Sequence, residues 1–105
     1  MNVDGWRFIK SNEYYYLYRK NNTMKLVISI SNAINIPVLW SNVNNTFIPF
    51  EYSPKTVVTT VSYNQYNPPS AVGVMGNNGK CEVIAKSLSG SQITTTIYAI
   101  LTWEI

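Results

Sequence analysis

The sequence predicts an all-β fold, an antiparallel β-sandwich of jelly-roll-like form with about seven or eight strands. The first observation behind this prediction is that apolar residues recur with a period of two, whereas a helical period is absent. The second is that turn-forming residues separate short runs rich in Val, Ile, Thr and Tyr. The third is the length of 105 residues, which suits one core, so residues 1–105 are expected to form a single domain.

Asn21-Asn22 is the first turn signal, and it predicts a hairpin between residues 13–20 and residues 23–31. One face of this hairpin then pairs Leu17 with Leu26 and Tyr15 with Ile28. The opposite face carries the pairs Tyr16 with Val27, Tyr14 with Ser29 and Tyr18 with Lys25. Because this second face is too aromatic to be fully solvated, we expect a neighbouring strand or loop to cover it. A platform for a ligand is the alternative.

Residues 33–40 alternate again and predict the next strand. One side of it would carry Ile34, Ile36, Val38 and Trp40. Pro37 lies within the run and has no N–H to donate, so this strand is expected at a sheet edge or with a bulge. The Asn-rich residues 41–46 that follow are expected to form a polar loop.

Three segments are expected between this loop and the second hairpin. Residues 47–52 are apolar but interrupted by proline, which favours an extended crossover. Residues 56–63 are rich in β-branched side chains and predict a strand. Residues 64–70 contain Pro68-Pro69 and predict a long loop.

Asn78-Gly79 is the strongest hairpin signal, since both residues tolerate the positive φ of a type I′ turn. With Asn77 opposite Lys80, the apolar pairs fall on one face: Val74 with Val83, Val72 with Ala85 and Gly76 with Cys81. The other face pairs Met75 with Glu82 and Ala71 with Lys86. Turn chemistry and alternation therefore agree on one register.

Residues 92–105 predict a long closing strand. One face, suited to the core, carries Ile93, Thr95, Ile97, Ala99, Leu101, Trp103 and Ile105. Because the segment is longer than a typical strand of about 5 to 6 residues, a bend or bulge is expected within it. The other face carries Thr94, Thr96, Tyr98 and Ile100, and is too apolar to be simply solvated.

Few residues are available for catalysis or metal binding. The chain has five Asp and Glu, no His and one Cys, which leaves no Ser-His or Cys-His nucleophile and no usual nitrogen ligand for zinc. Cys81 falls on the apolar face of its hairpin, where a buried, inert thiol is expected. We therefore predict no enzyme, no cofactor and no metal site.

The charge pattern argues against some partners. Eight Lys and Arg give a net charge of +3, but no basic run interleaves with aromatic residues, so no nucleic-acid partner is predicted. No apolar stretch reaches the length of a membrane span, so no membrane insertion is predicted.

Two loops combine aromatic and amide side chains, the groups that stack on sugar rings and hydrogen-bond their hydroxyls. The candidate ligand-binding residues are Trp40 and Asn42 in one loop and Tyr63, Asn64, Gln65, Tyr66 and Asn67 in the other. The alternative is that the aromatic residues belong to the core at strand ends and that the amides only make turns.

The order of several short motifs resembles the C-terminal head domains of bacteriophage tail-fibre, baseplate and receptor-binding proteins. The motifs are Gly5-Trp6-Arg7-Phe8-Ile9-Lys10, Tyr16-Leu17-Tyr18-Arg19-Lys20-Asn21-Asn22, Ile48-Pro49-Phe50-Glu51-Tyr52-Ser53-Pro54 and Asn78-Gly79 before the closing strands. The spacing of the proline-flanked motif is not identical to that of the family. The likeness covers most of the chain.

This resemblance implies a homotrimeric β-sandwich on the tail of a virion that contacts a host cell-surface polysaccharide, and a head that ends a longer protein. In such a trimer, the face with Thr94, Thr96, Tyr98 and Ile100 is the expected subunit contact. The resemblance assigns no individual sugar-binding residue, because the His and clustered acids that some members use are lacking. The alternative is a non-catalytic structural or trimerisation module of a phage particle or bacterial surface protein.

Overall fold

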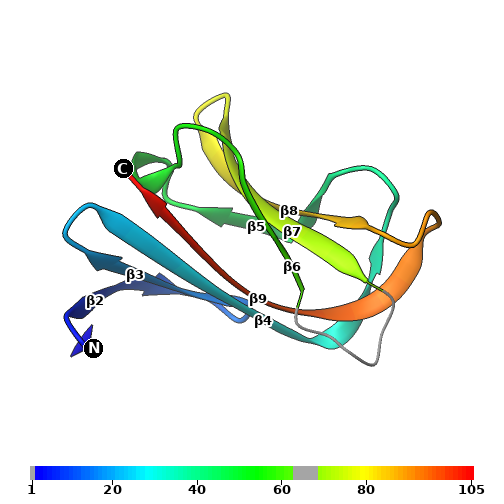
Figure 1. The fold of residues 1–105 in the computed structure, drawn as a ribbon, viewed down its shortest axis with the longest axis horizontal. Helices are drawn as coiled ribbons and strands as arrows, with labels where there is room; N and C mark the ends of the chain where they lie inside the picture. Colours follow the sequence, from blue (N-terminus) through cyan, green and yellow to red (C-terminus); the bar gives the residue numbers. More distant parts are fainter. Residues whose placement is uncertain (1, 63–68) are drawn as a thin grey trace.

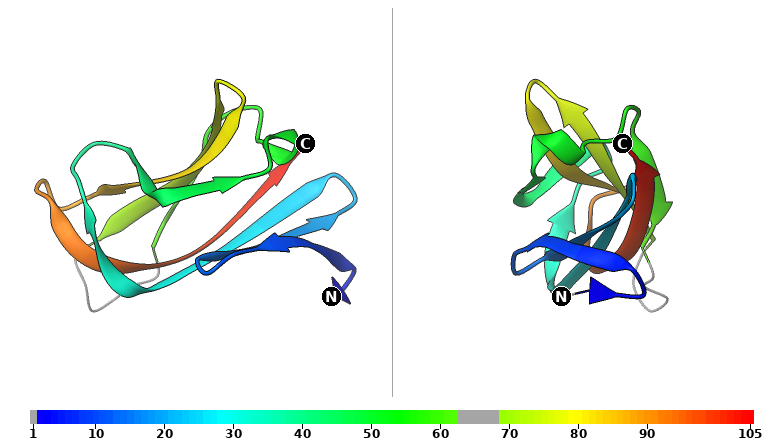
Figure 2. Two further views of the ribbon diagram at one scale, coloured as in Figure 1. Left: turned by 180° about the vertical axis from the view of Figure 1, so that it is seen from behind. Right: turned by 90° about the vertical axis from the view of Figure 1, so that its left-hand side faces the viewer.

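The computed structural model describes residues 2–62 and 69–105 and consists of two antiparallel β-sheets packed face to face (Figures 1 and 2). One sheet has the strand order β1-β2-β3-β4-β9 and the other has the order β5-β8-β7-β6. The strands are β1 (Asn2–Val3), β2 (Trp6–Ser11), β3 (Tyr15–Lys20), β4 (Thr23–Ile36), β5 (Ser41–Ile48), β6 (Val58–Val61), β7 (Ser70–Asn77), β8 (Lys80–Ser87) and β9 (Ile93–Glu104). The predicted all-β sandwich is therefore confirmed.

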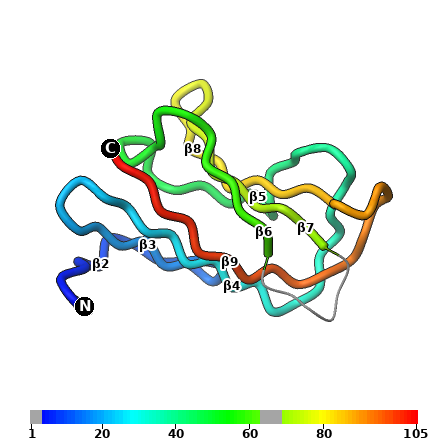
Figure 3. Tube along the Cα trace, viewed as in Figure 1, coloured from blue at the N-terminus to red at the C-terminus, as the bar shows by residue number. Residues whose placement is uncertain are grey.

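The chain crosses between the sheets after β4 and returns to the first sheet after β8. Strands β1 to β4 form a meander, and β9 completes their sheet beside β4. In the other sheet, β6, β7 and β8 follow one another while β5 lies beside β8, which is the Greek-key arrangement. Both chain ends lie at one end of the sandwich, and the loops after β4 and β8 lie at the other (Figures 1 and 3).

The core lies between the two sheets and takes alternate residues from β3, β4, β7, β8 and β9. From the five-stranded sheet it takes Leu17, Leu26 and Ile97, and from the four-stranded sheet Val72 and Val83, all at most 1% exposed. At one end of the core the indole Nε1 of Trp103 donates a hydrogen bond to the carbonyl oxygen of Tyr52, 2.7 Å away. The only polar group of this large ring is thereby satisfied.

Both predicted hairpins are confirmed in register. Asn78 and Gly79 form the second turn with φ of 51° and 76°, and all six predicted residue pairs are found between β7 and β8. In the first hairpin, Leu17 pairs with Leu26 and Tyr16 with Val27, as predicted. Only Asn21 has positive φ there, at 55°.

The prediction of a separate strand over residues 33–40 is wrong. Strand β4 continues through this region to Ile36, and a bulge between Ile30 and Ile34 adds residues that β9 does not match. The strand ends before Pro37, which cannot donate an N–H to a ladder. Val38 and Trp40 consequently do not continue the row of Ile34 and Ile36, and both are exposed.

The predicted polar loop over residues 41–46 is also wrong, because these residues belong to β5. The ladder between β5 and β8 breaks between Asn42 and Phe47, where Asn44 and Asn45 take positive φ of 46° and 57°. Asparagine tolerates this conformation better than most residues. The asparagines therefore make a bulge within a strand, where the composition had suggested a loop.

The predicted loop over residues 64–70 lies mostly outside the described residues, and Ser70 already belongs to β7. The other predictions hold in outline. Phe47 and Ile48 end β5, and Phe50–Tyr52 form the short 3₁₀ helix η1 within the expected crossover. Strand β6 is shorter than the predicted residues 56–63. The closing strand β9 has the predicted alternation, with its inward side chains from Ile93 to Trp103 buried. Its ladder is irregular on the β4 side, so the extra residues lie in β4.

Candidate functional site

The described part of the chain has few groups that could bind a metal ion or act as a nucleophile. Within residues 2–62 and 69–105, no group of three or more His, Cys, Asp or Glu side chains could hold a metal ion. Cys81 is fully buried, as predicted, and this burial raises the pKa of its thiol, so it stays protonated at neutral pH. A protonated, enclosed thiol is a poor nucleophile. No helix in this part of the chain is long and apolar enough to cross a membrane.

Two backbone hydrogen bonds bring separate segments together at the end of the sandwich opposite the chain ends. The N–H of Ser87 donates to the carbonyl oxygen of Pro37 at 2.8 Å, and the N–H of Leu88 donates to that of Pro69 at 2.9 Å. We call the segments that meet here, residues 37–41, Pro69 and residues 86–90, the loop end (Figure 1, right). The loop end therefore contains Trp40, one of the residues that the sequence singled out for saccharide binding.

The loop end presents apolar side chains to solvent. Leu39 is 79% exposed and Trp40 is 39% exposed, and Val38 and Leu88 are exposed as well. The Lys86 ammonium lies 5.6 Å from the centre of the Trp40 ring, within the range of a cation–π contact. This contact gives the indole a charged neighbour at the surface and helps to hold its orientation.

The predicted saccharide-binding residues lie in different environments, and some lie outside the described residues. Trp40 is at the surface of the loop end and is available to a ligand. The side-chain nitrogen of Asn42 donates to the carbonyl oxygens of Thr46 (3.0 Å) and Val83 (3.4 Å), so this amide supports the bulge of β5. The other predicted residues, Tyr63, Asn64, Gln65, Tyr66 and Asn67, lie outside the described residues.

The outer face of the five-stranded sheet carries a second exposed surface. Tyr16, Val27 and Ile100 lie side by side across β3, β4 and β9, and we call this row the apolar stripe. Tyr16 and Ile100 are each 49% exposed, so the neighbouring strand or loop expected over this face does not cover them. Nearer β2 the face is closed by its own side chains, because Lys25 lies over the ring of Trp6 at 4.6 Å.

The four predicted subunit-contact residues share the outer face of β9. Ile100 belongs to the apolar stripe, and Tyr98 and Thr96 are half-buried beside it. The hydroxyl of Thr94 donates to Oδ1 of Asn35 at 2.7 Å. The backbone N–H of Tyr98 donates to the hydroxyl of Ser62 at 3.0 Å, which ties the edge of β9 to the chain just after β6.

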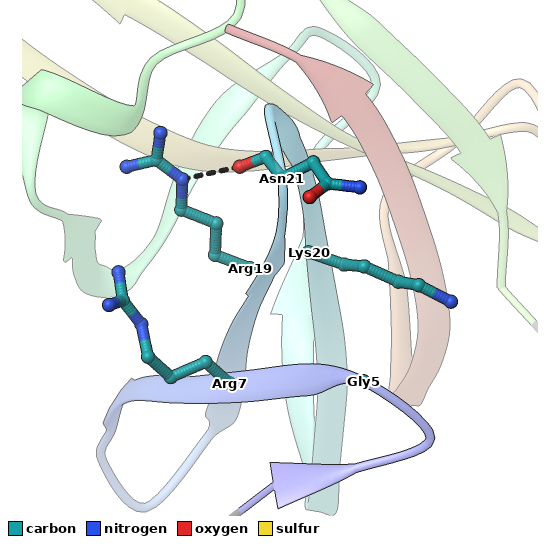
Figure 4. A pocket seen from close by; sticks show the side chains of 5 residues that line it. All are labelled: Gly5, Arg7, Arg19, Lys20 and Asn21. Atoms are coloured by element: carbon teal, nitrogen blue, oxygen red, sulfur yellow. Dashed lines mark hydrogen bonds between the residues drawn. The ribbon is translucent and has the colours of Figure 1, made fainter.

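A third feature, which the sequence reasoning missed, is a hollow near the chain ends with a volume of about 430 Å³. It is lined by Gly5, Arg7, Arg19, Lys20 and Asn21, and we call it the basic hollow (Figure 4). Arg7 lies directly opposite Arg19 across β2 and β3. The clustering of basic residues toward the N-terminus is visible in the sequence, but their pairing depends on a register shift between Phe8 and Lys10 that no turn signal predicts.

Comparisons with known proteins add no family to these observations. No protein-family model, curated protein or solved structure matches the chain.

Proposed function

We propose that this protein is a non-catalytic recognition module that binds a host cell-surface polysaccharide, as a trimeric head on the tail of a virion. The observation that carries the proposal is the loop end, where the indole of Trp40 is exposed among other exposed apolar side chains and has the Lys86 ammonium beside it. The resemblance to phage tail-fibre head domains supports the same function.

The chemistry of the loop end suits a sugar. The face of an aromatic ring stacks on the C–H groups of a pyranose, and a largely uncharged surface carries no large desolvation cost for a neutral ligand. The Lys86 ammonium beside the ring can donate hydrogen bonds to sugar hydroxyls. Because both chain ends lie at the opposite end, a connection made there would leave the loop end free to meet a surface (Figure 1).

The apolar stripe favours a second candidate function, that of a structural or trimerisation module. Half-exposed Tyr16 and Ile100 in one row form a surface that association would bury. The stripe and the loop end lie on different parts of the molecule, so trimer formation and saccharide binding are compatible. A trimer that binds no saccharide would favour the second function alone.

Trp40→Ala tests the proposed function against a matched control. Trp6 also lies beside a lysine ammonium but near the chain ends, so Trp6→Ala removes an equivalent ring from outside the proposed site. Binding to polysaccharide from candidate host envelopes is measured on an array and by titration calorimetry. We expect Trp40→Ala to weaken binding by about tenfold, the effect of losing one stacking contact of roughly 1.4 kcal/mol, and Trp6→Ala to leave it unchanged.

Three results would contradict the proposal. If Trp40→Ala and Trp6→Ala weakened binding equally, the loss would reflect the fold and not the site. If wild-type protein bound no envelope polysaccharide while forming trimers in light scattering at micromolar concentration, the structural role would replace the recognition role. Release of reducing sugar from the polysaccharide would contradict the absence of catalysis.

A further inference from the structure

The basic hollow brings two like charges together. Arg7 and Arg19 are directly opposite each other in the β2–β3 ladder, an arrangement that destabilises a sheet when both side chains carry the same charge. In Figure 4 both side chains extend to the same side of their strands, whereas Lys20 extends to the other side. The two guanidinium groups therefore face one region of space at the surface.

None of the described carboxylates forms an ion pair with these two arginines, including that of Asp4 in the turn before Gly5. Glu104 lies at the same end of the sheet, opposite Thr23, yet Arg7, Arg19 and Lys20 form no ion pair with any residue in the ranges 2–62 and 69–105. The Arg7 side chain also has no hydrogen-bond partner in these ranges. The arginine pair is therefore a place where a bound anion would relieve repulsion.

The side chain of Arg19 is held in place by the turn that follows β3. Its Nε donates to the carbonyl oxygen of Asn21 at 2.7 Å, and an Nη donates to Oδ1 of Asn22 at 3.3 Å. Each guanidinium carries five N–H donors, so most of those of Arg19 and all of those of Arg7 remain for a ligand. A fixed guanidinium loses less conformational entropy on binding than a free one.

We propose that Arg7 and Arg19 form a binding site for a phosphate group, either free phosphate or a phosphate monoester. The charge of the pair matches that of a phosphate dianion, and planar guanidinium groups match its oxygen atoms in bidentate contacts. The hollow of about 430 Å³ has room for the group and for part of the molecule that carries it. This site lies at the opposite end of the molecule from the loop end and does not depend on saccharide binding there.

The test is a titration of isotopically labelled protein with inorganic phosphate and, separately, with glucose 1-phosphate at constant ionic strength, followed by amide chemical shifts. We expect saturable shifts that centre on residues 5–7 and 19–22. Arg7→Gln and Arg19→Gln should each weaken binding by about tenfold, as for the loss of one charge-assisted contact. Tighter binding of glucose 1-phosphate would assign the site to a monoester, and equal or weaker binding would assign it to free phosphate.

Lys20→Gln is the matched control, since it removes the same charge from the same hollow without touching the arginine pair. It should keep most of the affinity. If it weakened binding as much as the arginine variants, the effect would be one of general charge, and the proposed site would be refuted. Shifts that never saturate would also refute it. Retained shift dispersion in each variant confirms that it is folded.

Discussion

The loop end and the basic hollow lie at opposite ends of a molecule 39 Å long, and they offer ligands opposite kinds of surface. At the loop end, loops between the two sheets expose an indole and aliphatic side chains with one lysine beside them. At the hollow, two adjacent strands of one sheet present arginines with no acidic partner in the described residues. The first surface suits recognition by stacking and shape, and the second suits recognition by charge.

The largest effect is expected from a substitution that weakens ligand binding at both ends of the molecule together. Leu26 is fully buried in the centre of β4, and Leu26→Ala should lower the free energy of unfolding by about 2–5 kcal/mol, because it deletes methyl groups and leaves a cavity. Urea denaturation measures this loss. Saccharide and phosphate binding should decline together in proportion to the unfolded fraction. Separate loss of one binding activity would show that the two ends do not share a cooperative core.

Salt should weaken ligand binding at the two ends to different extents. Raising NaCl from about 50 mM to about 500 mM shortens the screening length to a few ångströms, so phosphate binding at the arginine pair should weaken by roughly three- to tenfold. Saccharide binding at Trp40 should change by less than about twofold, because stacking needs no net charge. Calorimetric titrations at both salt concentrations make the comparison. Equal salt sensitivity at both ends would contradict the distinction drawn between them.

Alanine substitutions of one glycine at each end should differ by a smaller amount in the free energy of unfolding. Gly5 at the hollow and Gly90 at the loop end have φ of +83° and +87°, so alanine at either position should cost about 1 kcal/mol through the left-handed conformation alone. A Cβ on Gly90 would meet nothing within 4 Å, whereas one on Gly5 would lie 3.2 Å from Cε of Lys20. We expect Gly5→Ala to be the more destabilising variant in urea denaturation. The reverse order would indicate that the Lys20 side chain moves aside without cost.

How much of the fold follows from the sequence depends on whether two local signals agree. At Asn78-Gly79 the turn type and the alternation of Val72, Val74 and Val83 specify one register, and the structure has that register. At residues 41–46 the asparagines carried a turn signal without a competing alternation, so a loop was predicted. These residues form a strand because they pair with β8, which is distant in sequence.

The candidate sites show the same limit. The sequence identified Trp40 as a candidate because an aromatic residue next to polar residues can be recognised from the sequence alone. It also grouped Asn42 with Trp40, but the Asn42 amide supports the β5 bulge through Thr46, which only the strand geometry reveals. The arginine pair of the basic hollow needs the irregular β2–β3 register, so residues twelve apart in sequence become neighbours without any local signal.

The ladder between β4 and β9 has a mechanical consequence. It joins eleven residue pairs, from Thr23 with Glu104 near the chain ends to Ile36 with Ile93 near the loop end. A force between a partner held at the loop end and a connection at the chain ends would act along these strands. Many hydrogen bonds would then resist it in shear at the same time, whereas a force that pulled the two chain ends apart would peel the sheet edge bond by bond. In the proposed function, where the chain ends connect to a longer protein, this arrangement would resist tension between that connection and a ligand held at the loop end.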